Sequence, residues 1–200
     1  MILIKSGKIL LLCLFLMLSA ISHAQKDRKN VIRINPLSLF LDNISTFYER
    51  GFTPRSSATI GINYMNAGII KVPLSGYGLT LEYRYHTRKK EIKTPKGFYV
   101  GPWVRYQDYS VTGYVGIKDP HGNVQNISGS VSASQYAVGG LIGYEIIGKK
   151  GLAIDFFVGP YYNYTSFGLS AGYSIISIPL ISVPTAGVWL RSGISIGHAF

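Results

Sequence analysis

Cysteine is almost absent from this chain. The only one, Cys13, lies in an apolar stretch near the N-terminus. A disulfide needs two cysteines, so the sequence excludes a disulfide framework within the chain. We expect Cys13 to be removed with a secretory signal, so the mature chain should carry no thiolate chemistry and no lipoprotein anchor at this position.

Long apolar runs are also missing after the N-terminal segment. The nearest candidate, residues 175–183, is interrupted by Ser177, Pro179 and Ser182, whereas a membrane-spanning helix needs about 20 apolar residues. The hydrophobic fraction is nevertheless 47%, with 15 Tyr and 23 Gly. Membrane-like composition without a spanning helix is typical of β-barrels, in which lipid-facing and lumen-facing residues alternate.

Acidic residues and metal-ligand patterns are scarce. The chain has 9 Asp and Glu against 20 Lys and Arg, and the basic residues gather in short turns of a chain that we expect to be exported, so nucleic acid is not an expected partner. His23, His86, His121 and His198 are scattered. We expect no metal site, no cofactor and no catalytic residues, because no ligand spacing and no Ser–His motif is present.

The first 24 residues have the three parts of a secretory signal. Lys5 and Lys8 provide the positive region, residues 9–20 the apolar core, and residues 22–24 a small-x-small cleavage site. We expect cleavage before Gln25, a short basic leader over 25–29 and one barrel domain over 30–200.

The remaining chain reads as eight strands. Side chains in a strand alternate between two faces, and residues 77–86 show the clearest alternation, with Tyr and Leu on one face and Gly, Thr, Glu, Arg and His on the other. The expected strands are 30–39 (with Pro36 at a bulge or edge position), 44–52, 58–64, 77–86, 98–107, 132–146, 152–163 and 186–200. Short turns follow the second, fourth and sixth strands, and long loops follow the third, fifth and seventh.

These features predict an all-β fold, an eight-stranded antiparallel up-and-down transmembrane β-barrel. In the last strand Val188, Leu190, Ile194, Ile196 and Phe200 share one face, and closing this strand against the first removes both sheet edges. An even strand number places both termini and the short basic turns on the periplasmic side, with the long loops outside.

Aromatic spacing favours lipid on the outside. Tyr77 and Tyr85, Phe98 and Tyr106, and Tyr136 and Tyr144 are each eight residues apart on one face, which places them at the two borders of an apolar band about 25 Å tall. A soluble lipocalin-type barrel would show the same alternation with the faces reversed. The glycines on the polar face argue against it, because a narrow eight-stranded interior needs small residues.

With these features, residues 30–200 resemble the small eight-stranded outer-membrane proteins, the OmpA-transmembrane-domain and OmpX-like group, and the porin-like barrel families of unknown function. The alternating C-terminal strand that ends in Phe200 carries the resemblance, although His198 stands where that group usually has an aromatic or aliphatic residue. The resemblance implies an outer-membrane location, contact with its lipids, and recognition of the last strand and Phe200 by the barrel-assembly machinery. The peptidoglycan-binding domain of full OmpA-like proteins is not expected.

The polar face also collects charges that a barrel would place in its lumen. They are Arg33, Glu49, Glu82, Arg84, Arg105, Glu145, Asp155 and Arg191. Four acids balance four arginines, and buried charges need partners, so we expect a salt-bridged network with a structural role. An ion or proton path, or acid–base work by a carboxylate pair such as Glu49 and Glu82, remains an alternative.

For function, the sequence favours a structural or surface-interaction protein of the outer membrane that is not an enzyme. Its long loops would meet an external ligand that the sequence does not identify. A lipid-modifying enzyme of the acyltransferase or deacylase type, with its site at the outer rim, and a narrow channel for small solutes are the alternatives.

Overall fold

The computed structural model describes residues 28–39, 43–67, 74–87, 94–118, 121, 123–167, 174–177 and 186–200. The expected signal over 1–24 and most of the expected leader lie outside these residues. The described strands are β1 (Asn30–Ile34), β2 (Asn43–Gly51), β3 (Ser56–Ala67), β4 (Leu74–His86), β5 (Gly97–Lys118), β6 (Val124–Ile147), β7 (Leu152–Phe167), β8 (Ser174–Ser177) and β9 (Ala186–Ala199).

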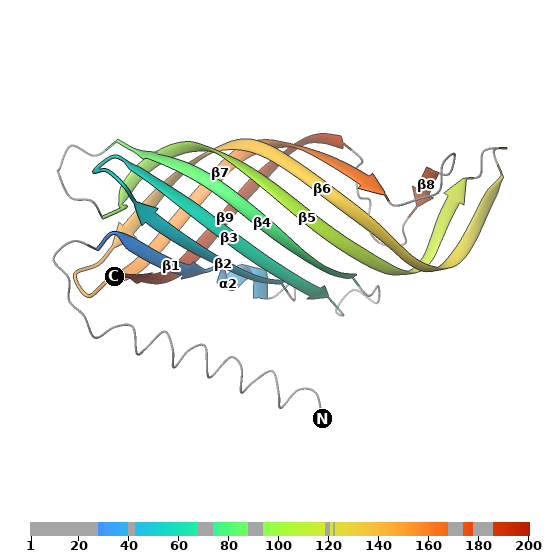
Figure 1. The fold of residues 1–200 in the computed structure, drawn as a ribbon, viewed down its shortest axis with the longest axis horizontal. Coiled ribbons are helices and arrows are strands. Elements are labelled where there is room, and N and C mark those ends of the chain that lie inside the picture. Colours follow the sequence, from blue (N-terminus) through green and yellow to red (C-terminus); the bar gives the residue numbers. More distant parts are fainter. Residues whose placement is uncertain are drawn as a thin grey trace, which may run out of the picture.

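Eight of these strands form a closed antiparallel barrel, which confirms the predicted fold class. The order is β4-β3-β2-β1-β9-β7-β6-β5, and β4 pairs with β5 to complete the ring (Figure 1). The closing seam joins β1 to β9 through pairs such as Arg33 with Gly197. Backbone hydrogen bonds between Asn30 and Phe200, of 3.1 and 2.8 Å, extend this seam to the last residue.

The two ends of the barrel differ. One end, called here the turn end, holds Asn30, Phe200 and the turns after β2 and β6. Gly97 and Gly151 have φ values of 97° and 94° there, a left-handed conformation that glycine adopts without steric cost. The opposite end, called the loop end, receives the connections after β1, β3, β5 and β7, as the chain order requires.

The expected first strand, 30–39, is wrong in its second half. Residues Pro36–Leu39 form a one-turn helix, α2. The side-chain oxygen of Asn35 accepts hydrogen bonds from the backbone N–H groups of Leu37 (3.0 Å) and Ser38 (3.4 Å), as an N-cap residue does. Proline fits the first helical position because its missing N–H would have no partner there.

The expected long loop after the fifth strand is mostly strand. β5 and β6 remain paired from Gly97 with Glu145 to Lys118 with Val124, whereas β4 pairs with β5 only up to Val111. Their outer halves therefore form an arm, residues 112–118 and 124–130, that projects beyond the barrel (Figure 1). The short strand β8 lies within the expected loop over 165–185 and pairs with β5 on this arm.

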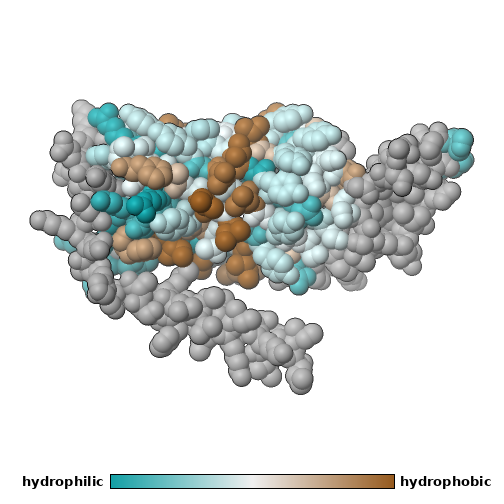
Figure 2. Space-filling model, in the orientation of Figure 1, coloured by the Kyte–Doolittle hydropathy of each residue, from teal (hydrophilic) through white to brown (hydrophobic). Residues whose placement is uncertain are grey.

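The barrel surface is apolar in its middle. Figure 2 shows a hydrophobic band across the face in view, with paler surface on both sides. Large exposed side chains of this middle region include Leu79, Leu81, Val104, Val138 and Ile142, each between 45% and 55% exposed. Among the described residues, no helix is long and apolar enough to cross a membrane.

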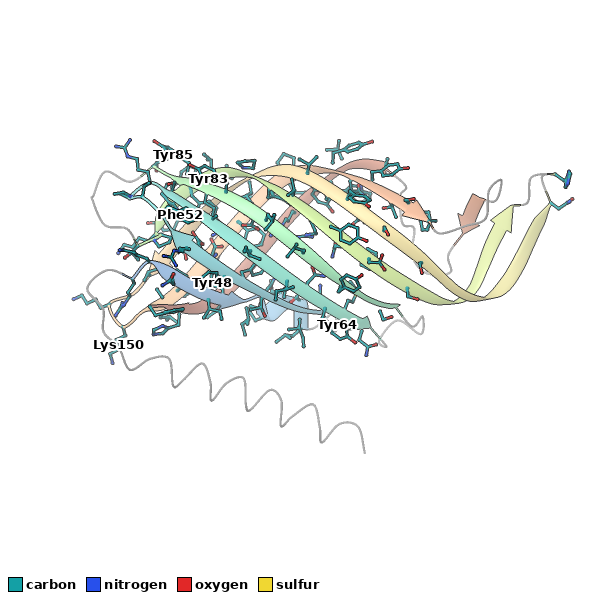
Figure 3. All side chains as sticks on the ribbon, in the orientation of Figure 1. Tyr48, Phe52, Tyr64, Tyr83, Tyr85 and Lys150 are labelled. Atoms are coloured by element: carbon teal, nitrogen blue, oxygen red, sulfur yellow. The ribbon has the colours of Figure 1, made fainter. Side chains whose placement is uncertain are left out.

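Aromatic side chains border this band in two rows. Nearer the loop end, cross-strand pairs join Tyr64 with Tyr77, Tyr106 with Tyr136, and Tyr136 with Tyr164. Nearer the turn end, Phe98 pairs with Tyr144 and Tyr144 with Phe156. Figure 3 shows Tyr83, Tyr85 and Phe52 near the turn end and Tyr64 toward the other. The eight-residue aromatic spacing thus spans from one row to the other.

Candidate functional site: the charge cluster in the lumen

All eight charged residues singled out in the sequence belong to inward-facing positions of the barrel. Seven of them are at most 8% exposed and lie in one group, named here the charge cluster. Its members are Arg33 of β1, Glu49 of β2, Glu82 and Arg84 of β4, Glu145 of β6, Asp155 of β7 and Arg191 of β9. The strand alternation turns each of them inward, and closure of the sheet brings them together.

Arg33 stands among three carboxylates. Its Nη2 donates to Glu49 Oε2 at 2.5 Å, its Nη1 donates to Glu145 Oε1, and its Nε lies 3.9 Å from Asp155 Oδ2. Arg33, Glu49 and Asp155 have no exposed surface. The planar guanidinium can serve several carboxylates at once, a geometry that lysine lacks.

Arg84 and Glu82 connect the rest of the cluster. Arg84 donates to Glu82 Oε2 at 2.8 Å and to Glu49 Oε2 at 3.0 Å, and its Nη1 lies 3.1 Å from Asp155 Oδ2. The other oxygen of Glu82 accepts a 2.6 Å hydrogen bond from Arg191. Arg84 also lies over the ring of Tyr99, with 4.4 Å to the centroid. Each arginine of the cluster therefore has at least one carboxylate partner.

Arg105 stands apart from this cluster. No carboxylate oxygen in the described part of the chain lies within 4.0 Å of its guanidinium; Nε donates to Thr80 Oγ1 at 3.0 Å, and the group lies over Trp103 at 5.1 Å. The sequence places Arg105 inside the barrel, but the expected carboxylate partner is not there. The four acids and three of the arginines thus form the charge cluster, and Arg105 lies outside it.

Ser57, His86 and Tyr99 join the cluster without having been singled out from the sequence. Ser57 Oγ donates to Glu49 Oε1 at 2.5 Å and lies 3.0 Å from His86 Nε2, while Tyr99 donates to Asp155 Oδ1 at 2.8 Å. Tyr99 and His86 occupy inward-facing positions in their strands. Strand alternation assigns both residues to the polar face, but it does not give their partners.

The Ser57–His86–Glu49 group differs from a catalytic triad. In a triad the carboxylate orients the imidazole through Nδ1, leaving Nε2 to activate the serine. Here Glu49 binds the serine instead, and His86 Nδ1 is buried without a hydrogen-bond partner among the described residues. Ser57 has no exposed surface and His86 is 2% exposed, so a substrate cannot reach the hydroxyl in this arrangement.

Apolar side chains enclose the cluster. Near the turn end, Val31, Ile147, Ala153 and Ala199 are buried together. Trp103 and Phe157 pack against Arg191, with 4.5 and 4.8 Å from the guanidinium carbon to the ring centroids. Among the described residues, no group of three or more His, Cys, Asp or Glu could hold a metal ion. The arrangement is chemically suited to mutual charge neutralisation inside a tightly filled barrel.

Comparison with protein families gives a match over most of the chain. A family model with the description "Protein of unknown function (DUF3575)" matches residues 9–168. The chain belongs to the DUF3575 family. No curated protein and no solved structure matches this DUF3575 chain.

Proposed function

We propose that this protein is an integral β-barrel of the bacterial outer membrane with a structural or surface-interaction role and no catalysis. The observation that carries the proposal is the inverted distribution of residues. Charged side chains are buried in the lumen, whereas the outward face is an apolar band with an aromatic row on each side. In water such a band would favour association, whereas in a bilayer it matches the hydrocarbon core and its two interfaces.

The surface role belongs to the loop end. The arm of β5 and β6 extends beyond Leu74 and Val111, the last pair between β4 and β5, and β8 pairs with β5 on this arm. Paired strands hold such a projection in a fixed direction, and an external ligand would meet it first. The turn end, with its basic side chains such as Lys149 and Lys150, would face the periplasm.

The two alternatives receive less support. The Ser57–His86 contact is the one feature of the described residues in favour of an enzyme, but it is buried at the turn end, away from the outer rim where a lipid-modifying site was expected. A narrow channel needs a continuous water path, and the burial of the charge cluster and of its apolar neighbours Tyr99, Trp103 and Phe157 argues against one.

Fractionation of cells that produce the full chain tests the proposal. We expect the protein in the outer-membrane fraction, resistant to extraction with alkaline carbonate, and migrating faster on gels before boiling than after it. Recovery in the soluble periplasmic fraction would contradict the proposal. The expected partners follow from it: outer-membrane lipids around the band, and the barrel-assembly machinery at the last strand, so that removal of Phe200 should lower the amount assembled in cells.

A further inference from the structure

The lumen contains a small polar cavity on the loop-end side of the charge cluster. Its volume is about 50 Å³, and its polar lining consists of Asn43, Ser45, Asn63, Thr80, Arg105 and Gln107. A water-sized probe needs roughly 10–15 Å³, so this space has room for a few atoms. None of the residues that line it carries a carboxylate.

The cavity has hydrogen-bond donors without acceptors. Arg105 uses Nε for Thr80, and neither of its Nη atoms donates a hydrogen bond within the described residues. Asn63 Nδ2 is buried and likewise has no acceptor there. Buried N–H groups are normally paired, because leaving them without an acceptor costs stability.

The guanidinium of Arg105 also has no carboxylate within 4.0 Å among the described residues. The charge cluster has four carboxylates and three arginines, so Arg105 balances the total charge of the eight residues, but it does so without touching any of these carboxylates. Trp103, which lies beneath Arg105 at 5.1 Å, lies beneath Arg191 at 4.5 Å as well. A cation in such surroundings is stabilised by an anion at hydrogen-bond distance.

We propose that this cavity is a binding site for a small oxyanion, a free carboxylate or phosphate or the same group on a larger molecule that enters from the loop end. Arg105 supplies the charge and its free Nη donors, Asn63 adds an amide donor, and Thr80 fixes the guanidinium through Nε. Asn63 and Gln107 close over Gly78, where a Cβ would lie 2.4 Å from Asn63 Oδ1 and 2.7 Å from Gln107 Cγ. This proposal does not depend on whether the barrel lies in a membrane.

Trp103 provides the signal for a test, because it contacts Arg105 and the other tryptophan, Trp189, can be replaced by Phe. The refolded full-length mature barrel is titrated with acetate, inorganic phosphate and glycerol phosphate at ionic strength fixed by an organic sulfonate too bulky for the cavity. We expect a saturable fluorescence change with at least one of them. A response to the free ions alone indicates a free anion, and a stronger response to glycerol phosphate indicates a group on a larger molecule.

Three variants make the test specific. Arg105→Gln should weaken binding about tenfold or more, the loss expected for a charge-assisted hydrogen bond, while Arg55→Gln at the exposed turn end should bind like the parent. Asn63→Asp supplies an internal acceptor, so it should abolish binding and raise the urea midpoint. The proposal is overturned if no probe gives a saturable response in the folded parent, or if Arg105→Gln or Asn63→Asp titrates like the parent.

Discussion

Arg33 holds three buried carboxylates together at one side of the charge cluster. It is fully buried, and Glu49, Glu145 and Asp155 all lie within 4.0 Å of its guanidinium. Without it, Arg84, at 4.0 Å, is the one basic partner left to Glu145 among the described residues. Removing one partner of a buried ion pair is costly because the remaining charges stay out of water without compensation.

We therefore expect Arg33→Met to lower the free energy of unfolding by about 3–5 kcal/mol, although methionine fills a similar space. Arg50→Met is the matched control, because Arg50 is exposed on the outward face of β2 and should change stability by about 0.5 kcal/mol or less. Urea midpoints of the refolded proteins measure both. Equal midpoints for the two variants would show that the cluster contributes no stability.

Residue positions were predictable, but partners were not. Strand alternation was enough to place the eight charged residues inside, since parity depends only on local sequence. The pairing of Arg33 with Glu145 joins residues 112 apart, and that of Arg84 with Glu49 joins residues 35 apart. Such pairs depend on the register of every strand between them, which the sequence alone does not specify, and for the same reason the isolation of Arg105 was missed.

At the scale of elements, the closing seam between β1 and β9 is the shortest strand pairing of the barrel. β1 has only five residues, and four of them pair with β9. Gly197 lies in this seam, and a Cβ there would meet the backbone oxygen of Ile32 at 1.8 Å. Backbone cannot move aside as a flexible side chain can, so the strands would have to separate.

Gly197→Ala is accordingly expected to destabilise the barrel by roughly 1–3 kcal/mol, as overpacking does, and to reduce the fraction that migrates as the compact form on unheated gels. Gly140→Ala is the control, because a Cβ at Gly140 meets nothing within 4 Å. Both variants carry the same chemical change in a barrel strand. A seam that tolerates Gly197→Ala as well as Gly140→Ala would contradict the close approach.

The elements themselves show where sequence patterns stop being informative. Alternation predicted the eight barrel strands, but the predicted strands 98–107 and 132–146 are shorter than β5 and β6. Residues 112–130 are rich in Gly and polar residues and lack a distinct apolar face, so alternation could not show that the strands continue there. Pairing between the two strands continues there without an apolar signal. At residues 35–39 the cap formed by Asn35 and Pro36 overrode the strand pattern, a local effect that depends on side-chain geometry.

At the scale of the whole molecule, the proposed membrane location predicts an orientation. His121 lies in the connection between β5 and β6, and Lys149 lies in the turn between β6 and β7, so the two are at opposite ends of β6. Cys13 is the only native cysteine, so cleavage of the proposed signal would leave a single introduced cysteine as the only thiol. A membrane-impermeant maleimide should label position 121 on whole cells and position 149 only after permeabilisation. Labelling of 149 alone on intact cells would invert the orientation.

The last prediction concerns conduction through the barrel, where the structural reading and the channel alternative differ. An ion that crosses the lumen has to pass the charge cluster, whose carboxylates and arginines are bonded to one another and at most 8% exposed. Pores that select ions typically present a ring of one sign toward water, whereas here opposite charges neutralise each other beside the apolar ring of Trp103. We expect the parent protein to give no steady single-channel current in a planar bilayer.

The double variant Glu82→Ser with Arg84→Ser removes one complete ion pair from this cross-section and should give small, unsteady currents, provided that unheated gels show the compact form. Arg50→Ser, outside the lumen, should remain silent. The channel reading becomes the better one if the parent itself conducts steadily, and if Glu82→Gln changes the ion selectivity of that current while leaving the urea midpoint in place. In that case the buried charges would act on passing ions rather than on the stability of the barrel.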